Sequence, residues 1–149
     1  MPTIVLIEPK IPQNTGNIGR LAAAYNCPLH IVGDIGFSLS DSALKRSGLD
    51  YWQFLDWTYF PNLDDYLETL STKRFFLLST HGLTPYTHAE FQYDDYLVFG
   101  SETQGLPKDL LKKYPDQLIT IPMPNSNIRS LNLSNSVSII LLHSLHKGF

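Results

Sequence analysis

Short apolar runs alternate with amphipathic segments along most of this chain. Five runs are dominated by aliphatic, β-branched or aromatic side chains, and continuous runs of this kind predict strands that are covered on both faces of a sheet. These predicted strands are Thr3 to Ile7, Leu29 to Val32, Phe75 to Ser79, Tyr96 to Phe99 and Gln117 to Ile121.

The segments between these runs have helical patterns. They predict helices over about Gly16 to Tyr25, Asp41 to Arg46, Leu63 to Leu70 and Pro107 to Lys113. Proline suits the first position of a helix, where its missing N–H would have no partner in the helix anyway. Strands that alternate with helices predict an α/β domain built on a parallel sheet.

The last predicted helix, from about Asn132 to Lys147, has apolar side chains on two faces. One face carries Leu133, Val137, Ile140, Leu141 and Leu145, and another carries Ile139 and Leu142. One face would pack on the sheet, and the other needs a partner that a chain of this size has little material to supply. This pattern favours a twofold homodimer.

Composition is that of an ordinary globular domain. The 149 residues are 43% hydrophobic and 17% charged, which predicts a single domain spanning residues 1–149. No segment approaches the roughly 20 apolar residues of a membrane span, and the polar residues Glu8, Lys10 and Asn14 leave no signal-peptide core near the start. We therefore expect a cytoplasmic protein with no membrane partner.

The net charge of −3 argues against a protein that coats DNA or RNA through bulk electrostatics. Basic residues nevertheless occur in small groups, at Lys45-Arg46, at Lys73-Arg74 and at Lys108 with Lys112-Lys113. A dimer could align two copies of these groups along one RNA, or they could be solvated surface charges.

Metal and thiol chemistry have little support in the sequence. Cys27 is the only cysteine, which excludes an internal disulfide and favours a buried hydrophobe. His143 and His146 have a spacing that could place both on one side of a helix, but no further ligands cluster with them. We expect no metal.

Three segments combine small polar residues with glycines or with a helix start. They read IPQNTGNIGR from Ile11 to Arg20, LVFGSETQGLP from Leu97 to Pro107, and IPMPNSNIRSLNLSNSVSIILLH from Ile121 to His143. Small polar residues at a helix start leave backbone N–H groups free to hold a ligand, and the apolar run behind them anchors that start in a core. The third segment in particular predicts a binding site.

A phosphate-binding loop is one interpretation of the glycines at Gly100 and Gly105. It fails because Leu106 and Pro107 follow where the motif needs Lys and then Ser or Thr, and because the spacing of a dinucleotide-binding loop is absent. The glycines could instead let the backbone approach a flat neutral group, or they could simply form a turn.

In order and spacing, the three segments resemble the three motifs of the SPOUT methyltransferases. The resemblance runs from the opening IVLIEPK to the last helix and is closest to the single-domain tRNA 2'-O-methyltransferases. It implies a C-terminal trefoil knot, S-adenosylmethionine as methyl donor, a homodimer through the first and last helices, and tRNA as substrate. The implied reaction is 2'-O-methylation of the wobble nucleotide, a cytidine or a modified uridine.

The resemblance also implies site residues. The cofactor pocket would be lined by Leu78, Gly100, Ile121, Met123, Ser130 and Leu131, and the catalytic set would be Arg20, Asn14 and Asn132. A guanidinium stays protonated in proteins, so Arg20 is better suited to clamping a phosphate and polarising the 2'-oxygen than to acting as a general base.

The neighbours of these residues keep more than one interpretation. Glu102 could form an ion pair with Arg20 or face solvent. Asn14 and Asn17 could form a turn and cap a helix, and Asn14 could also reach RNA. Later in the chain, Asn132 and Ser134 could cap the final helix, while Arg129 could face the methyl donor or RNA.

Two alternatives to the wobble methyltransferase are open at this point. One is a 2'-O-methyltransferase for another tRNA site or for ribosomal RNA, and the other is a catalytically silent RNA-binding module with the same fold. Intact motif residues argue against the silent module. One departure from the subgroup is Leu142-His143, where its members usually carry Tyr-Glu.

Overall fold

The computed structural model describes residues 1–40 and 50–146, and the helix predicted at Asp41 to Arg46 lies outside these ranges. The strands are β1 (Thr3–Ile7), β2 (Leu29–Val32), β3 (Trp57–Phe60), β4 (Phe75–Leu78), β5 (Thr84–Pro85), β6 (Tyr96–Phe99) and β7 (Leu118–Thr120). The α-helices are α1 (Pro12–Ala24), α3 (Leu63–Leu70), α4 (Lys108–Lys113) and α5 (Leu133–Leu145). The short 3-10 helices are η1 (Trp52–Phe54), η2 (Tyr86–His88) and η3 (Pro115–Gln117).

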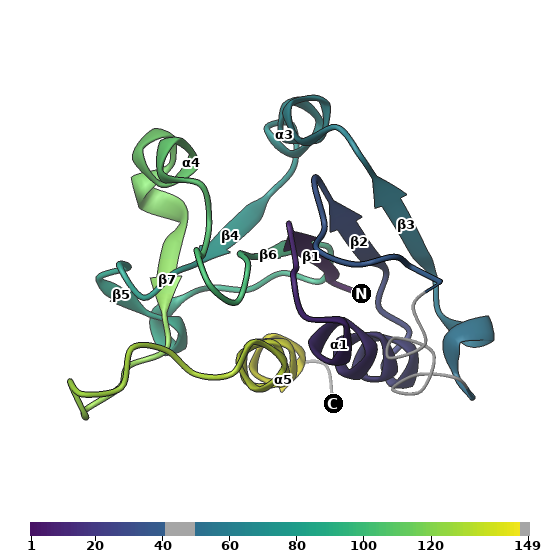
Figure 1. Cartoon of the computed structure of the whole chain (residues 1–149). Helices are drawn as coiled ribbons and strands as arrows, with labels where there is room; N and C mark the ends of the chain where they lie inside the picture. Colours follow the sequence, from purple (N-terminus) through teal and green to yellow (C-terminus); the bar gives the residue numbers. More distant parts are fainter. Residues whose placement is uncertain (41–49, 147–149) are drawn as a thin grey trace.

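The described strands form one sheet in the order β3-β2-β1-β6-β4-β7-β5, and every pairing in it is parallel. This confirms the predicted α/β class and the parallel sheet. In Figure 1, α1 and α5 lie on one side of the sheet while α3 and α4 lie on the other. Side chains that alternate along β1 serve the two layers, because Ile4 and Leu6 belong to the α1 and α5 core while Val5 and Ile7 belong to the core beneath α3 and α4.

The five predicted strands are all present, with ends that differ by one residue at most on either side. β3 and β5 were not predicted. They are the two edge strands of the sheet, and in β3 the side chains of Thr58 and Tyr59 are exposed. An edge strand of this kind has no continuous apolar run, which is the signal that identified the central strands.

Two helices start at different residues from those predicted. Helix α1 begins at Pro12, four residues before the predicted Gly16, with its proline at the first helical position. Pro107 precedes α4 as its N-cap residue instead of starting it. Helix α5 begins at Leu133, and Asn132 is its N-cap residue, as expected for that asparagine.

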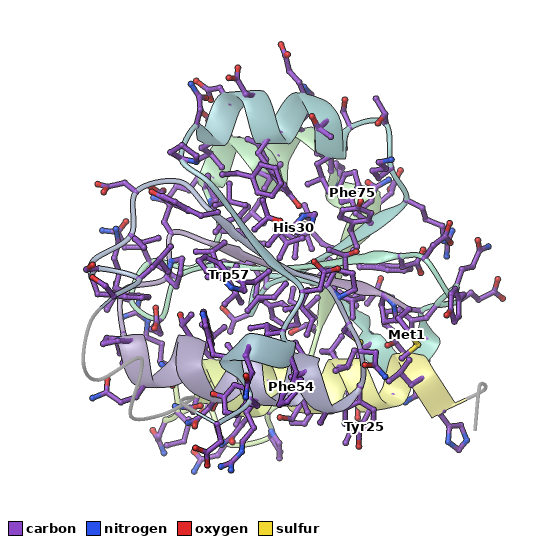
Figure 2. All side chains as sticks on the ribbon, turned by 90° about the vertical axis from the view of Figure 1, so that its right-hand side faces the viewer. Met1, Tyr25, His30, Phe54, Trp57 and Phe75 are labelled. Carbon is purple, nitrogen blue, oxygen red and sulfur yellow. The ribbon has the colours of Figure 1, made fainter. Side chains whose placement is uncertain are left out.

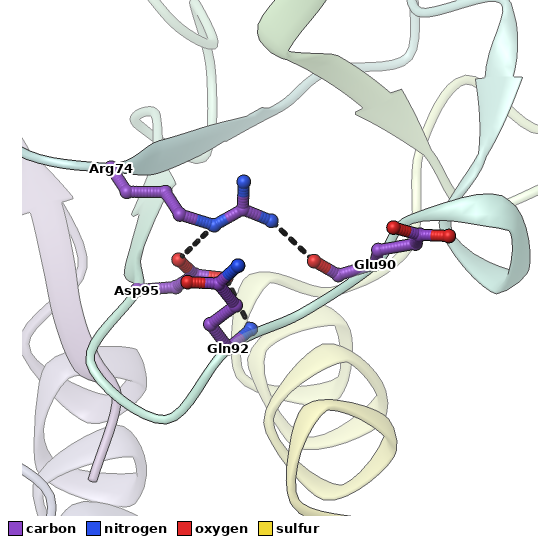
Figure 3. Close-up of polar contacts among 4 residues, drawn as sticks. All are labelled: Arg74, Glu90, Gln92 and Asp95. Carbon is purple, nitrogen blue, oxygen red and sulfur yellow. Dashed lines mark hydrogen bonds and ion pairs between the residues drawn. The ribbon is translucent and has the colours of Figure 1, made fainter.

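A buried carboxylate fastens the amino-terminal edge of the sheet (Figure 3). Asp95 has 0% of its surface exposed, and its Oδ1 lies 2.7 Å from Nε of Arg74. Its Oδ2 accepts a hydrogen bond from the Gln92 amide at 2.7 Å, and Arg74 also donates to the carbonyl of Glu90. Burial raises the pKa of Asp95, while the Gln92 amide and Arg74 oppose that shift. Of the basic pair at residues 73 and 74, Arg74 is therefore used within the protein.

A half-buried histidine lies on the other side of the sheet from α1. His30 points from β2 toward α3, and its Nδ1 lies 2.8 Å from the hydroxyl of Tyr66 (Figure 2). The rings of Phe60 and Tyr96 pack around it, at centroid distances of 4.9 and 5.9 Å. Burial lowers the pKa of His30, and Asp56 opposes part of that shift.

This lowered pKa makes folding stability depend on pH. His30 binds a proton more readily in the unfolded chain. The contribution of this group to the free energy of unfolding should therefore be fully present above a pH of about 6.5 and decline as pH falls toward the folded pKa. The decline cannot exceed about 1.4 kcal/mol per pH unit for one proton. Urea unfolding of His30→Phe between pH 7.5 and 5.5 should give a flatter pH dependence than wild type, with His88→Gln as the control for losing one histidine. An unchanged slope in His30→Phe would contradict this prediction.

Candidate active site

The carboxyl ends of three neighbouring strands meet at one edge of the sheet. Leu78, the last residue of β4, pairs with Phe99 of β6 and with Ile119 of β7. Gly100 follows β6 directly, and Ile121 follows β7. The structure thus brings together three residues that the sequence predicted for a cofactor pocket, at the sheet edge where parallel α/β proteins bind ligands.

The loop from β7 to α5 forms an apolar hollow. Its volume is about 250 Å³, and it is lined by Pro122, Met123, Pro124, Asn125, Ile128 and Leu131. Two of the predicted cofactor residues, Met123 and Leu131, belong to this lining. Ser130 lies in the same loop with an exposed side chain and is not part of the lining. Carbon-rich walls of this kind suit a flat, neutral group.

The loop after β6 closes on itself. The amide of Ser101 donates to the carbonyl of Gly105 at 3.2 Å, and the amide of Gly105 donates back to the carbonyl of Ser101 at 3.0 Å. Gly105 has a φ of +69°, which favours glycine. A Cβ at residue 100 would overlap the backbone of Gly105 and Leu106. The loop is therefore a tight turn, and the side chain of Glu102 within it points toward the start of α1.

Glu102 holds the start of α1. Its Oε1 accepts a hydrogen bond from the Lys10 amide at 2.8 Å, and its Oε2 accepts from the Ile11 amide at 2.8 Å and from Nδ2 of Asn14 at 3.2 Å. A carboxylate is favourable there because the amides at a helix start have no partner within the helix. Both interpretations from the sequence are wrong, since Glu102 neither pairs with Arg20 nor simply faces solvent.

Asn14 joins the first motif to the third. It is only 6% exposed, and its Oδ1 accepts a hydrogen bond from Nδ2 of Asn132 at 3.1 Å. Asn132 in turn caps α5, because its Oδ1 accepts from the Asn135 amide at 3.2 Å and from the Ser134 hydroxyl at 2.6 Å. Glu102, Asn14 and Asn132 form one hydrogen-bonded chain across all three motifs.

The expected role of the two motif-one asparagines in a turn is wrong. Asn14 and Asn17 lie inside α1, whose N-cap is Ile11, with no side-chain hydrogen bond. The Asn14 amide is engaged by Glu102 and Asn132, while the Asn17 side chain is exposed. The polar residues of this segment belong to the first turns of α1 and do not precede it.

The two arginines of the motifs lie at the surface. Nη2 of Arg129 donates to the carbonyl of Thr103 at 2.8 Å, which ties the third motif to the loop after β6. Arg20 is exposed on α1, and its guanidinium carbon lies 5.6 Å from the ring centroid of Tyr51. The sequence predicted neither Thr103 nor Tyr51 as a neighbour of these arginines, since a backbone carbonyl and a residue outside the motifs leave no local signal.

The Glu102 contacts give a testable consequence. Glu102→Gln replaces one acceptor oxygen with an NH₂ group that cannot accept from a backbone amide, so the start of α1 loses at least one hydrogen bond. We expect the free energy of unfolding to fall by about 1–3 kcal/mol. Urea unfolding measures this, with Glu68→Gln on the exposed surface of α3 as the matched control. Equal stability of the two variants would contradict the assigned role.

Comparison with known proteins agrees with this geometry. The family model of the SpoU rRNA Methylase family matches residues 1–142. The chain belongs to the SpoU rRNA Methylase family. The resemblance to SPOUT methyltransferases that the motifs predicted is thereby confirmed.

Individual members of the SpoU family match almost the whole chain. The tRNA (cytidine(34)-2'-O)-methyltransferase of Escherichia coli (strain K12) is 46% identical over 143 residues, which cover 95% of this chain and 90% of the relative. A solved structure described as structural insights into the 2-OH methylation of C/U34 on tRNA superposes with a TM-score of 0.92 at 40% identity. It covers 99% of this chain and 95% of the other.

A more distant member shares the fold. The SpoU methyltransferase AviRb from Streptomyces viridochromogenes, solved in complex with AdoMet, superposes with a TM-score of 0.84 at 23% identity. The match covers 99% of this chain and 60% of AviRb. SpoU methyltransferases thus keep this architecture at low sequence identity.

The remaining sequence predictions concern groups outside the SpoU motifs. Cys27 is buried, as predicted, and burial raises the pKa of its thiol to about 11. His143 packs edge-on against Tyr86 with a centroid distance of 4.9 Å, while His146 is exposed. Within residues 1–40 and 50–146, no three His, Cys, Asp or Glu side chains gather in a group that could hold a metal. None of the helices in those ranges is both long and apolar enough to cross a membrane.

Proposed function

We infer that this protein is a tRNA 2'-O-methyltransferase that methylates the ribose of the wobble nucleotide, position 34. The observation that carries this function is the 46% identity to the E. coli tRNA (cytidine(34)-2'-O)-methyltransferase over nearly the whole length of both chains. The hydrogen-bonded chain from Glu102 through Asn14 to Asn132 supports it, because the three motifs remain assembled as a working site requires.

We propose S-adenosylmethionine as the methyl donor. The residues that would hold it are Leu78, Gly100, Ile121, Met123, Ser130 and Leu131. They fit such a group, because the absence of a side chain at Gly100 leaves the backbone open and the hollow beside Met123 is lined mainly by carbon. When bound, the donor supplies an electrophilic methyl group on a sulfonium. No metal is part of this proposal.

Arg20 is the proposed catalytic residue. Its guanidinium is exposed, so it can meet an RNA phosphate, and it can donate a hydrogen bond to the 2'-oxygen as that atom attacks. Asn14 and Asn132, which the sequence placed in the catalytic set, hydrogen-bond to each other and to the helix starts. We propose that both asparagines position the motifs instead of touching the reacting atoms.

We also propose that residues 1–149 form one domain with a C-terminal trefoil knot, and that two copies form a homodimer through α1 and α5. In support of the dimer, α1 and α5 lie on the same side of the sheet (Figure 1), and Leu142 on α5 is 43% exposed. With tRNA as its substrate, the proposed location of the enzyme is the cytoplasm.

The function is tested by methyl incorporation from labelled S-adenosylmethionine into total tRNA from cells that lack this activity, followed by nucleoside mapping. A 2'-O-methyl group at position 34 is the expected result. Methylation at another tRNA position or only of ribosomal RNA would overturn the wobble assignment and keep the enzyme class. Cofactor binding with no transfer to any RNA would identify a silent binding module.

A further inference from the structure

Tyr51 and Trp52 cover the face of α1 that carries Arg20. The Tyr51 hydroxyl donates a hydrogen bond to the carbonyl of Gly16. The Trp52 ring lies against Gly19, where an added Cβ would stand 2.7 Å from Cζ3 of that ring. Residues 16, 19 and 20 are three and four positions apart, so they share one face of the helix. The start of η1 therefore sits directly beside Arg20.

Two contacts of Tyr51 concern Arg20 itself. The guanidinium carbon of Arg20 lies 5.6 Å from the centroid of the Tyr51 ring, within the roughly 6 Å over which a cation and an aromatic face attract. In an α-helix the carbonyl of Gly16 is the acceptor for the amide of Arg20, so the hydroxyl of Tyr51 binds at the same backbone hydrogen bond. Tyr51 thus binds the helix backbone at the Gly16 carbonyl and contacts the guanidinium of Arg20 with its ring.

In the described part of the chain Arg20 forms no ion pair with a carboxylate, because the one ion pair found there joins Arg74 to Asp95. A long exposed side chain that no ion pair holds in place samples many rotamers. A ring beside the guanidinium narrows that set before substrate arrives, and pre-organisation of this kind raises the rate of a step that needs in-line geometry.

We propose that Tyr51 is a positioning residue for Arg20, holding its guanidinium in the orientation used during methyl transfer. This inference rests on the proposed function and extends it to a residue outside the three motifs. The ring carries the effect through its contact with the guanidinium, and the hydroxyl adds to it by fixing the ring on α1.

Steady-state kinetics of Tyr51→Leu and Tyr51→Phe test the proposal. Tyr59 supplies a matched control, because it is also partly exposed and its hydroxyl also donates to a glycine carbonyl, that of Gly33 at 2.8 Å. We expect Tyr51→Leu to lower kcat about tenfold or more, Tyr51→Phe to lower it less, and the Kd for S-adenosylmethionine to stay within about twofold. Tyr59→Leu and Tyr59→Phe should keep the wild-type kcat.

Two kinetic outcomes would overturn the proposal. One is a kcat for Tyr51→Leu within about twofold of wild type. The other is a loss of cofactor affinity as large as the loss of kcat, together with a Tm well below that of Tyr59→Leu, because this would mean a structural role for Tyr51 alone.

The contact itself can be tested without activity. The chain has four arginines, so the Nε–Hε signal of Arg20 in a ¹⁵N-arginine NMR spectrum can be assigned with Arg20→Lys. The Tyr51 ring should shift this signal, and the shift should vanish in Tyr51→Leu and persist in Tyr51→Phe. An unshifted signal in wild type overturns the proposal even if the enzyme is active. A shifted signal in a protein that methylates no RNA overturns the proposed function and the positioning role with it.

Discussion

Arg20→Ala should abolish methyl transfer while cofactor binding stays close to wild type. Arg20 is exposed on α1 and contacts Tyr51, whereas the residues proposed to hold S-adenosylmethionine lie at the ends of β4, β6 and β7 and in the loop before α5. Removal of a charged donor that stabilises a developing negative oxygen costs about 100-fold or more in rate. The loss should therefore fall on kcat at saturating cofactor.

Single-turnover methyl transfer and calorimetric titration with S-adenosylmethionine measure the two effects separately. Arg20→Lys is the informative companion, because it keeps the positive charge and loses the planar fork that contacts a phosphate and an oxygen together. We expect this variant to lie between wild type and Arg20→Ala. If Arg20→Ala lost cofactor affinity and transfer to the same extent, Arg20 would belong to the cofactor site and its assigned role would be wrong.

Gly100→Ala should disrupt the loop after β6 and with it the cofactor site. A Cβ at this position would overlap the carbonyl carbon of Gly105 and the amide nitrogen of Leu106. Both are backbone atoms of a turn closed by two hydrogen bonds between Ser101 and Gly105, so no side-chain rotation can make room. Forced overpacking of this kind costs about 1–3 kcal/mol or more.

Gly105→Ala is the matched control for this substitution. Nothing lies within 4 Å of a Cβ at residue 105, and its φ of +69° imposes only the left-handed penalty of about 1–2 kcal/mol. Urea unfolding should rank Gly100→Ala as the less stable variant, and calorimetry should show at least a roughly tenfold weaker cofactor affinity for Gly100→Ala than for Gly105→Ala. Similar cofactor affinities in the two variants would contradict the placement of Gly100 in the pocket.

The hydrogen-bonded chain across the motifs joins residues whose distant partners the sequence did not predict. Glu102 and Asn14 are 88 residues apart, and Asn14 and Asn132 are 118 apart. Local spacing reveals that each residue belongs to a polar helix start or to a glycine turn, but it carries no information about which distant amide faces which oxygen. The two alternatives for Glu102, an ion pair with Arg20 or a solvent-facing side chain, were both wrong for this reason.

The sequence by itself determined the elements whose signal is local. Runs such as Thr3 to Ile7 carry apolar side chains at consecutive positions from Ile4 onward. Short runs of this kind, separated by helical segments, are typical of strands buried on both faces, and they predicted the parallel α/β class. Motif residues determined the family, because their order along the chain is independent of how the chain folds.

Only the tertiary structure decided the rest. The edge strand β3 has exposed side chains and gains its place by pairing with β2, and Tyr51 gains its place beside Arg20 because η1 packs on α1. Glu102 binds the start of α1 because the turn after β6 aims it there. Each of these contacts forms only when whole helices, strands and loops pack together. That packing depends on burying both faces of the sheet at once.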